Sequence, residues 1–151
     1  MNDPQGFGFC KAGFLFLLAL AVLLITSNTG VAGSGPKVLI LNSYHKDFKW
    51  TDAQVSSAEQ VLRNQIKKVE IFVEYMDTKR IYNQEYLKEL SDLYHVKYGS
   101  MALGTVMTTD DNALWFALKH HADLFGEAPI SFCGINDYRE HLIAKNHKVT
   151  G

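Results

Sequence analysis

The stretch Val38-Leu39-Ile40-Leu41-Asn42-Ser43-Tyr44-His45 determines the fold and indicates where the function lies. Its first four residues are all apolar, which predicts a strand covered on both faces, because a strand with one face in water alternates apolar and polar residues. Polar and aromatic residues follow directly, at the carboxyl end of that strand. In an open α/β sheet, ligands bind in the crevice outside the carboxyl ends of the strands. The stretch therefore favours a small-molecule binding cleft over a catalytic centre.

Strand and helix patterns alternate along the rest of the chain. We expect further strands at 69–75, 102–107 and 129–133, the first of them nearer the sheet edge, and a fifth strand starting at 149–151. Helices are expected from Thr51, which forms an approximate capping box with Gln54, over 84–98, from Asp110 or Asp111 to Gly126, and over 138–145. The positions expected to face the core are Val55, Ala58, Leu62 and Ile66, then Tyr86, Leu87, Leu90, Leu93 and Tyr94, then Leu114, Ala117, Leu118 and Leu124. This alternation predicts an α/β fold, a three-layer Rossmann-like or flavodoxin-like lobe with a mostly parallel, doubly wound sheet.

The first 35 residues stand apart from this lobe, which we place at 36–151. Residues 12–25 are continuously apolar, a length that fits the core of a signal peptide, about 7–15 residues, and falls short of the roughly 20 that span a bilayer. Small residues at 31–33 suit cleavage after Ala32 or Gly33. Lys11 is the only basic residue before the apolar run, so an uncleaved anchor in the inner membrane is the alternative. In either case the lobe is expected to be exported, to a periplasmic or other extracytoplasmic location.

Charge and cysteine usage exclude several classes of protein. The formal net charge is -1, which argues against nucleic-acid binding, since such proteins usually carry a basic stripe. The two cysteines, Cys10 and Cys133, are too few for a disulfide scaffold. Once a signal peptide is removed, Cys133 is left alone, and we expect it to be buried and inert.

Four segments resemble a known family when taken in order: LILNSYHKDFKWTDAQ at 39–54, VEYMDTKR at 73–80, TTDDNALWF at 108–116 and PISFCGINDY at 129–138. Together they look like the substrate-binding proteins of bacterial ABC transporters. The same module also serves as the extracytoplasmic sensor of membrane histidine kinases and diguanylate cyclases. The resemblance covers about 37–151, and it departs from the family at 100–104, where a more polar approach with an aspartate is usual.

The resemblance implies two Rossmann-like lobes hinged around a cleft, as in type I periplasmic binding proteins. This chain supplies the first lobe and looks truncated, because the second lobe is missing. The implied partners are a small-molecule ligand and either a transporter permease in the membrane or a membrane-bound output domain of the same protein.

Carrying the motifs over residue by residue places ten side chains at the cleft. These are Ser43, Tyr44, His45 and Trp50 around the first strand end, Asp77 after the second strand, Thr109, Asp110 and Asp111 after the third, and Asn136 and Asp137 after the fourth. An apolar wall with a few oriented polar groups is what a small-molecule site needs. For Ser43 and Asn136 the alternative is that they only satisfy turn backbone.

The pair Asp110 and Asp111 has several interpretations. Two adjacent carboxylates can act as acid and base, chelate a cation or hold an amine, while one of them can instead cap the following helix. We expect one to cap and the other to face the cleft. A phosphoacceptor site is rejected, because the first strand is not followed by acidic residues.

No cofactor or metal site is expected. His120 and His121 are neighbours, so on a helix they point about 100° apart and cannot easily share a metal with His45. Glycine fingerprints for phosphate or dinucleotide binding and a Gly-x-Ser-x-Gly elbow are absent from the sequence. Lys79 and Arg80 are interpreted as a solvated turn.

Three functions compete at this point. The first is a solute-binding lobe that serves an ABC-type transporter, and the second is the ligand-sensing domain of a membrane kinase or cyclase. The third, given low weight, is an enzyme that uses His45, Asp110 and Asp111, since no nucleophile–base pair is visible. The chain itself is expected not to be an enzyme, although a longer parent of the sensor type would carry a kinase or cyclase domain.

Overall fold

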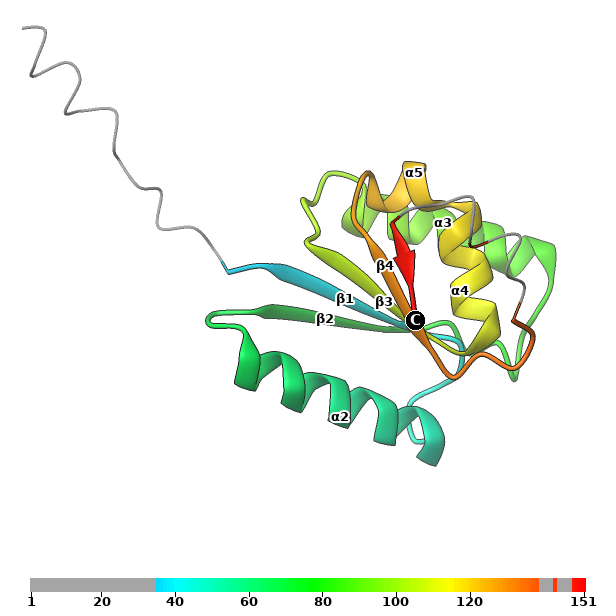
Figure 1. The fold of residues 1–151 in the computed structure, drawn as a ribbon. Helices are drawn as coiled ribbons and strands as arrows, with labels where there is room; N and C mark the ends of the chain where they lie inside the picture. Colours follow the sequence, from blue (N-terminus) through cyan, green and yellow to red (C-terminus); the bar gives the residue numbers. More distant parts are fainter. Residues whose placement is uncertain (1–34, 139–142, 144–147) are drawn as a thin grey trace, which may run out of the picture. The chain divides into compact units, whose positions relative to one another are not determined.

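The computed structural model describes residues 35–138, 143 and 148–151, and its strands form one parallel sheet (Figure 1). The strands are β1 (Lys37–Asn42), β2 (Glu70–Tyr75), β3 (Thr105–Thr109), β4 (Ile130–Cys133) and β5 (Val149–Thr150). Their order is β2-β1-β3-β4-β5, and every neighbouring pair is parallel. This is the doubly wound order of flavodoxin-like sheets, so the expected α/β class and parallel sheet are confirmed.

Helices cover both faces of the sheet. Helix α2 (Lys49–Gln65) lies on one face, and α3 (Gln84–Tyr98), α4 (Asp110–Lys119) and α5 (His121–Phe125) lie on the other (Figure 1). The larger core lies on the face with three helices, where the β1 residues Leu39 and Leu41 pack with residues such as Tyr94 and Leu114. On the α2 face the core is smaller and consists of Val38, Ile40, Val55 and Ala58. The all-apolar pattern of β1 follows from this double coverage, since successive side chains point to opposite faces.

The register brings four strand ends into one row. Asn42 at the end of β1 pairs with Tyr75 of β2 and Thr109 of β3, and Thr109 pairs with Cys133 of β4. The loops that follow these strands therefore leave the sheet at the same edge, which we call the carboxyl edge. The two-residue strand β5 lies beside β4, and the expected strand at 149–151 is confirmed.

The helix expected over 84–98 is confirmed as α3, but the caps expected for the first and third helices were wrong. Helix α2 begins at Lys49 with the extended residue Phe48 as its N-cap, and no side chain caps it. Thr51 is buried inside the first turn, because the Phe48 ring packs against Tyr44 and His45 and starts the helix earlier. Helix α4 has Thr109 as its N-cap, again without a side-chain hydrogen bond, so neither Asp110 nor Asp111 caps it.

Other boundaries differ more modestly. The third strand covers 105–109 and not 102–107, because the Leu103 N–H bonds to Met101 O in a turn before the strand. The third helix divides at His120 into α4 and α5. Leu93 is half exposed on α3, where Tyr98 is buried in its place. The helix expected at 138–145 falls largely outside the described residues, and so does the apolar stretch 12–25.

Candidate functional site

Two of the expected site residues hold the carboxyl edge together from inside. Ser43 is fully buried, and its hydroxyl donates to Thr109 O at 2.8 Å and accepts from the Ala113 N–H at 2.8 Å. The Thr109 hydroxyl donates to Asn42 Oδ1 at 2.9 Å, also fully buried. These bonds join β1 to β3 and to the first turns of α4. Both hydroxyls are thus engaged within the protein, as the alternative interpretation of Ser43 anticipated.

Asp110 occupies a strained position at the start of α4. Its φ of 64° lies in the left-handed region, which few residues other than glycine, asparagine and aspartate adopt. The side chain is 2% exposed. One carboxylate oxygen, Oδ1, accepts from the indole N–H of Trp50 at 3.1 Å, and the other, Oδ2, has no hydrogen-bond partner among the described residues. Burial raises the pKa of Asp110 and neighbouring Asp111 adds to this, while the Trp50 hydrogen bond and the charge of Lys79 oppose it.

Asp111 has a different task. Its Oδ1 accepts from the backbone N–H groups of Asn136 and Asp137, at 3.1 and 3.0 Å, and the Asn136 amide donates to its Oδ2 at 3.4 Å. The side chain therefore fixes the loop that follows β4 against the start of α4. Asn136 and Asp137 are exposed on that loop.

His45 and Asp77 meet at the end of β1 and β2. The His45 Nδ1 atom lies 3.5 Å from Asp77 Oδ1, and neither atom makes a hydrogen bond among the described residues. The other oxygen of Asp77 accepts from Arg80 at 3.1 Å. Asp77 also has a positive φ, 52°, as does Asp47 at 70°. Three aspartates that follow three different strands thus adopt left-handed backbone.

Aromatic rings form the outer wall of the edge. The rings of Tyr44 and Phe48 meet edge to face with centroids 5.4 Å apart. The Lys79 ammonium lies over both, 4.4 Å from the Tyr44 centroid and 4.8 Å from that of Phe48. Burial raises the pKa of the Tyr44 phenol, with Asp110 and Asp111 adding to the effect. Lys79 is exposed, but it is stacked on the site and does not simply project into solvent as expected.

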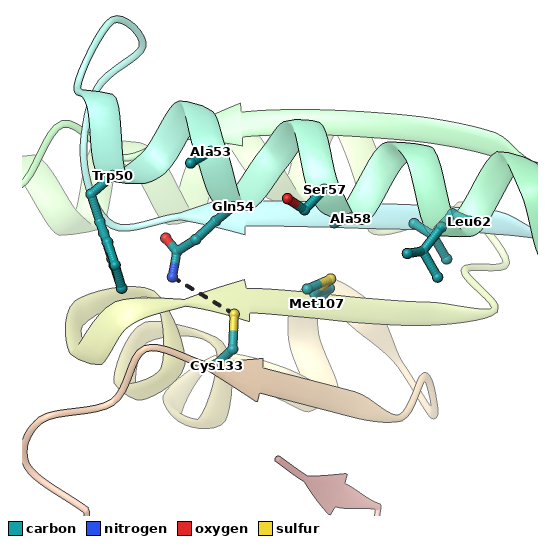
Figure 2. A pocket seen from close by; sticks show the side chains of 9 residues that line it. Trp50, Ala53, Gln54, Ser57, Ala58, Leu62, Met107 and Cys133 are labelled. Carbon is teal, nitrogen blue, oxygen red and sulfur yellow. Dashed lines mark hydrogen bonds between the residues drawn. The ribbon is translucent and has the colours of Figure 1, made fainter.

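Two hollows meet at Trp50. The first, about 350 Å³, is lined by Tyr44, Phe48, Trp50, Asp110, Gly134, Ile135 and Asn136, and we call it the polar hollow. The second, about 510 Å³, runs between α2 and strands β3 and β4, and we call it the apolar groove. Its lining residues are Trp50, Ala53, Gln54, Ser57, Ala58, Val61, Leu62, Met107 and Cys133 (Figure 2). Within the groove, Gln54 extends from α2 and its amide nitrogen lies 3.8 Å from Cys133 Sγ (Figure 2).

Buried polar atoms without a partner concentrate at this edge. Among the described residues the atoms without a hydrogen bond are His45 Nδ1, Thr51 Oγ1, Gln54 Oε1, Asp77 Oδ1 and Asp110 Oδ2. They come from the loops after β1 and β2, the first turns of α2 and the start of α4. His45 Nδ1 and Asp77 Oδ1 face each other at 3.5 Å, and the other three face no such group. Buried polar groups are hydrogen-bonded in the large majority of cases, so a cluster of exceptions needs an explanation. A ligand that supplies the missing partners is such an explanation.

The expected site residues are thus divided by the structure. Tyr44, Trp50, Asp110 and Asn136 line the polar hollow, His45 and Asp77 pair beside it, Asp111 fixes the loop of Asn136 and Asp137, and Ser43 and Thr109 are buried in the framework. Sequence reasoning missed Phe48, Gln54, Gly134 and Lys79. Gly134 carried a usable signal, since a glycine directly after an apolar strand often marks a positive φ; in the structure its φ is 74°.

The described part of the chain holds neither a metal-binding cluster nor a membrane-spanning helix. There, no three histidine, cysteine, aspartate or glutamate side chains are grouped so that they can hold a metal ion. His120 and His121 bond instead to Ser91 and to the Ala128 carbonyl, at 3.2 and 2.6 Å. None of the helices in the described ranges has the length and hydropathy required to cross a membrane.

Comparison with known proteins adds no assignment to this geometry. No family model, no curated protein and no solved structure matches the chain. The candidate site therefore rests on the residues and contacts described above.

Proposed function

We propose that the chain is the ligand-binding lobe of an extracytoplasmic solute-binding protein that serves an ABC-type transporter. The observation that carries this proposal is the set of buried polar atoms without partners at the carboxyl edge. Binding sites in doubly wound sheets lie at this edge, and a small molecule supplies hydrogen bonds that the protein has left unmade. The resemblance of segments 39–54, 73–80, 108–116 and 129–138 to substrate-binding proteins supports the same function.

The proposed mechanism is closure of two lobes on a ligand. A lobe of this kind presents half of a cleft, and ligand contacts with a second lobe favour the closed state by hinge motion. Because one lobe supplies only part of such a cleft, binding by this lobe alone is expected to be weak, in the millimolar range, about -4 kcal/mol.

The experiment that tests binding is a chemical-shift map of the ¹⁵N-labelled chain against pools of small metabolites. Amide shifts at 44–50 and 134–137 are expected, since these residues surround the polar hollow. Residues 99–104 lie at the opposite ends of the strands and provide an internal control. Shifts that appear only at 99–104, or in no segment with any pool, would contradict the proposal.

A ligand sensor is the second candidate. It is favoured by the single basic residue, Lys11, before the apolar run 12–25, which is a weak signal-peptide start and suits a retained anchor. The lobe would then bias a kinase or cyclase output domain in the same protein. Mass spectrometry of the N-terminal peptide of the exported protein separates the two functions. A mature chain that begins at Gly33 or Ser34 supports the transporter component. An intact N-terminus in the inner membrane supports the sensor.

A further inference from the structure

The side chains of Gln54 and Asp110 both approach Gly134. A Cβ atom added to Gly134 would lie 2.7 Å from Gln54 Nε2 and 3.1 Å from Asp110 Oδ1. The side chains of Gln54 and Asp110 therefore approach each other across this glycine. Gly134 keeps open the space between the two side chains, where Gln54 Nε2 and Asp110 Oδ1 face it. Gln54 Oε1 and Asp110 Oδ2 are both buried and both lack a donor among the described residues.

The chemistry of these two atoms defines the group that complements them. Both are acceptors, so the missing group is a donor, and an ionised carboxylate favours a donor with positive charge. Of the described residues that line the polar hollow and the apolar groove, Asp110 alone carries a charge. Lys79 is not among the lining residues, although its ammonium lies over the rings of Tyr44 and Phe48, which line the polar hollow. Among the lining residues themselves, a head group meets one carboxylate and no cation.

The apolar groove indicates the chemistry of the rest of the ligand, the body to which that head group is attached. Trp50 lines both hollows, and Gln54 lines the groove while its amide approaches Asp110. Beyond Gln54 the groove is bounded by Ala58 and Met107 (Figure 2), which supply apolar surface for the body of a ligand. A ring placed beside Trp50 also gains aromatic contact.

We propose that this site binds an amphipathic amine, whose cationic nitrogen is held by the Asp110 carboxylate and whose apolar body lies along α2. The inference rests on the proposed function and specifies its ligand class. Asp110 is 2% exposed, so the head group reaches it after a shift of the neighbouring Trp50 indole, which is 55% exposed and is held to Asp110 by one hydrogen bond. Ligand binding therefore changes the environment of the Trp50 N–H.

Three probes with one ring and different head groups test the proposal: phenethylamine, 2-phenylethanol and phenylacetate. The readout is the indole N–H signal of Trp50 in the full ¹⁵N-labelled chain, with the Trp115 indole as internal reference and Trp50→Phe to assign the two signals. We expect phenethylamine to shift the Trp50 signal at concentrations at least about tenfold lower than the other two probes, as a charged hydrogen bond implies. Asp110→Asn should remove that preference, and Asp123→Asn, on α5, should retain it.

Each outcome has a distinct meaning. A preference for the amine that Asp110→Asn abolishes supports the proposal. Equal responses to all three probes, or a preference for phenylacetate, overturn the amine class and leave the binding function standing. A metabolite screen that also finds no shift at 44–50 or 134–137 overturns both. Because the comparison of probes is made on the unaltered chain, it does not depend on whether Asp110→Asn folds.

Discussion

The indole N–H of Trp50 donates to Asp110 Oδ1 at 3.1 Å and so joins the first turn of α2 to the first residue of α4. Sixty residues separate the two side chains in the sequence. The bond satisfies only one oxygen of a buried carboxylate. The chain therefore maintains a charge in a place where burial disfavours it.

Asp110→Asn is expected to stabilise the fold at neutral pH. Burial raises the pKa of Asp110, so the folded chain holds this proton more tightly than the unfolded chain, and stability falls as pH rises from the ordinary aspartate value through the folded one. Asparagine tolerates the positive φ and still accepts from Trp50. We expect a gain of about 1 kcal/mol in the free energy of unfolding at neutral pH, measured with urea. The gain should vanish in acid, where Asp110 is protonated. A loss of stability at neutral pH would contradict the conclusion that the buried charge destabilises the folded chain.

Ser43→Ala is expected to destabilise the carboxyl edge. The substitution leaves the Ala113 N–H and the Thr109 carbonyl without their side-chain partner in a fully buried site. An unsatisfied buried group costs about 1–3 kcal/mol, which urea unfolding resolves. Ser57→Ala, at an exposed position on α2, is the control and should change stability by no more than about 0.5 kcal/mol. Equal effects of the two substitutions would be inconsistent with a framework role for Ser43.

Gly134→Ala is expected to close the space between Gln54 and Asp110. The new methyl group would lie within 2.7 Å of the Gln54 amide, and the φ of 74° adds backbone strain. Gly126 is the matched control, since it also has a positive φ, 58°, but a Cβ there meets nothing within 4 Å. Both substitutions should lower thermal stability, by about 1–3 kcal/mol, while only Gly134→Ala should shift the Trp50 indole signal. An unshifted signal in Gly134→Ala would mean that this crowding does not reach the site.

The buried tyrosines of α3 are expected to limit stability in alkali. Burial raises the pKa of Tyr94 and of Tyr98, and a hydrogen bond from Tyr98 to Glu74 raises the latter further. The folded chain therefore keeps both phenols protonated, and stability is lost as pH rises above the ordinary value of 10.0. Ultraviolet titration should show these two of the chain's seven tyrosines ionising only as the circular dichroism signal is lost. In Tyr98→Phe the melting temperature should decrease less steeply with pH above that value. An unchanged slope would contradict the assignment of the alkaline instability to ionisation of this phenol.

Local sequence patterns predicted the sheet well and the site only in part. The apolar run of β1 predicted a strand inside the sheet, and the alternation of β2 predicted a strand at the edge of the described sheet. Both predictions hold because a strand covered by helices on both faces is apolar throughout, whereas a less covered strand alternates. The cap expected at Thr51 was wrong, since the ring of Phe48 packs on Tyr44 and His45 and Phe48 is the N-cap, three residues earlier. Gln54 was interpreted only as part of a capping box.

The contacts that define the candidate site were beyond local reasoning. The Trp50–Asp110 bond and the approach of Gln54 to Gly134 join segments that the sheet order brings together, and neither has a signature in sequence spacing. The different tasks of Asp110 and Asp111 arise in the same way, because a left-handed residue at the start of α4 turns one side chain inward while the other bonds the loop after β4. The ligand-contact predictions for Tyr44, Trp50, Asp110 and Asn136 stay predictions.

The left-handed aspartates after β1, β2 and β3 also restrict how this edge can evolve. At 47, 77 and 110 the backbone admits glycine, asparagine and aspartate readily and branched residues hardly at all. If these three positions are randomised and variants are selected only for folding, the surviving variants should carry mainly glycine, asparagine or aspartate there. Changes of ligand specificity would then have to arise at neighbouring positions such as Gln54 and Asn136, whose backbone accepts a wider range of side chains.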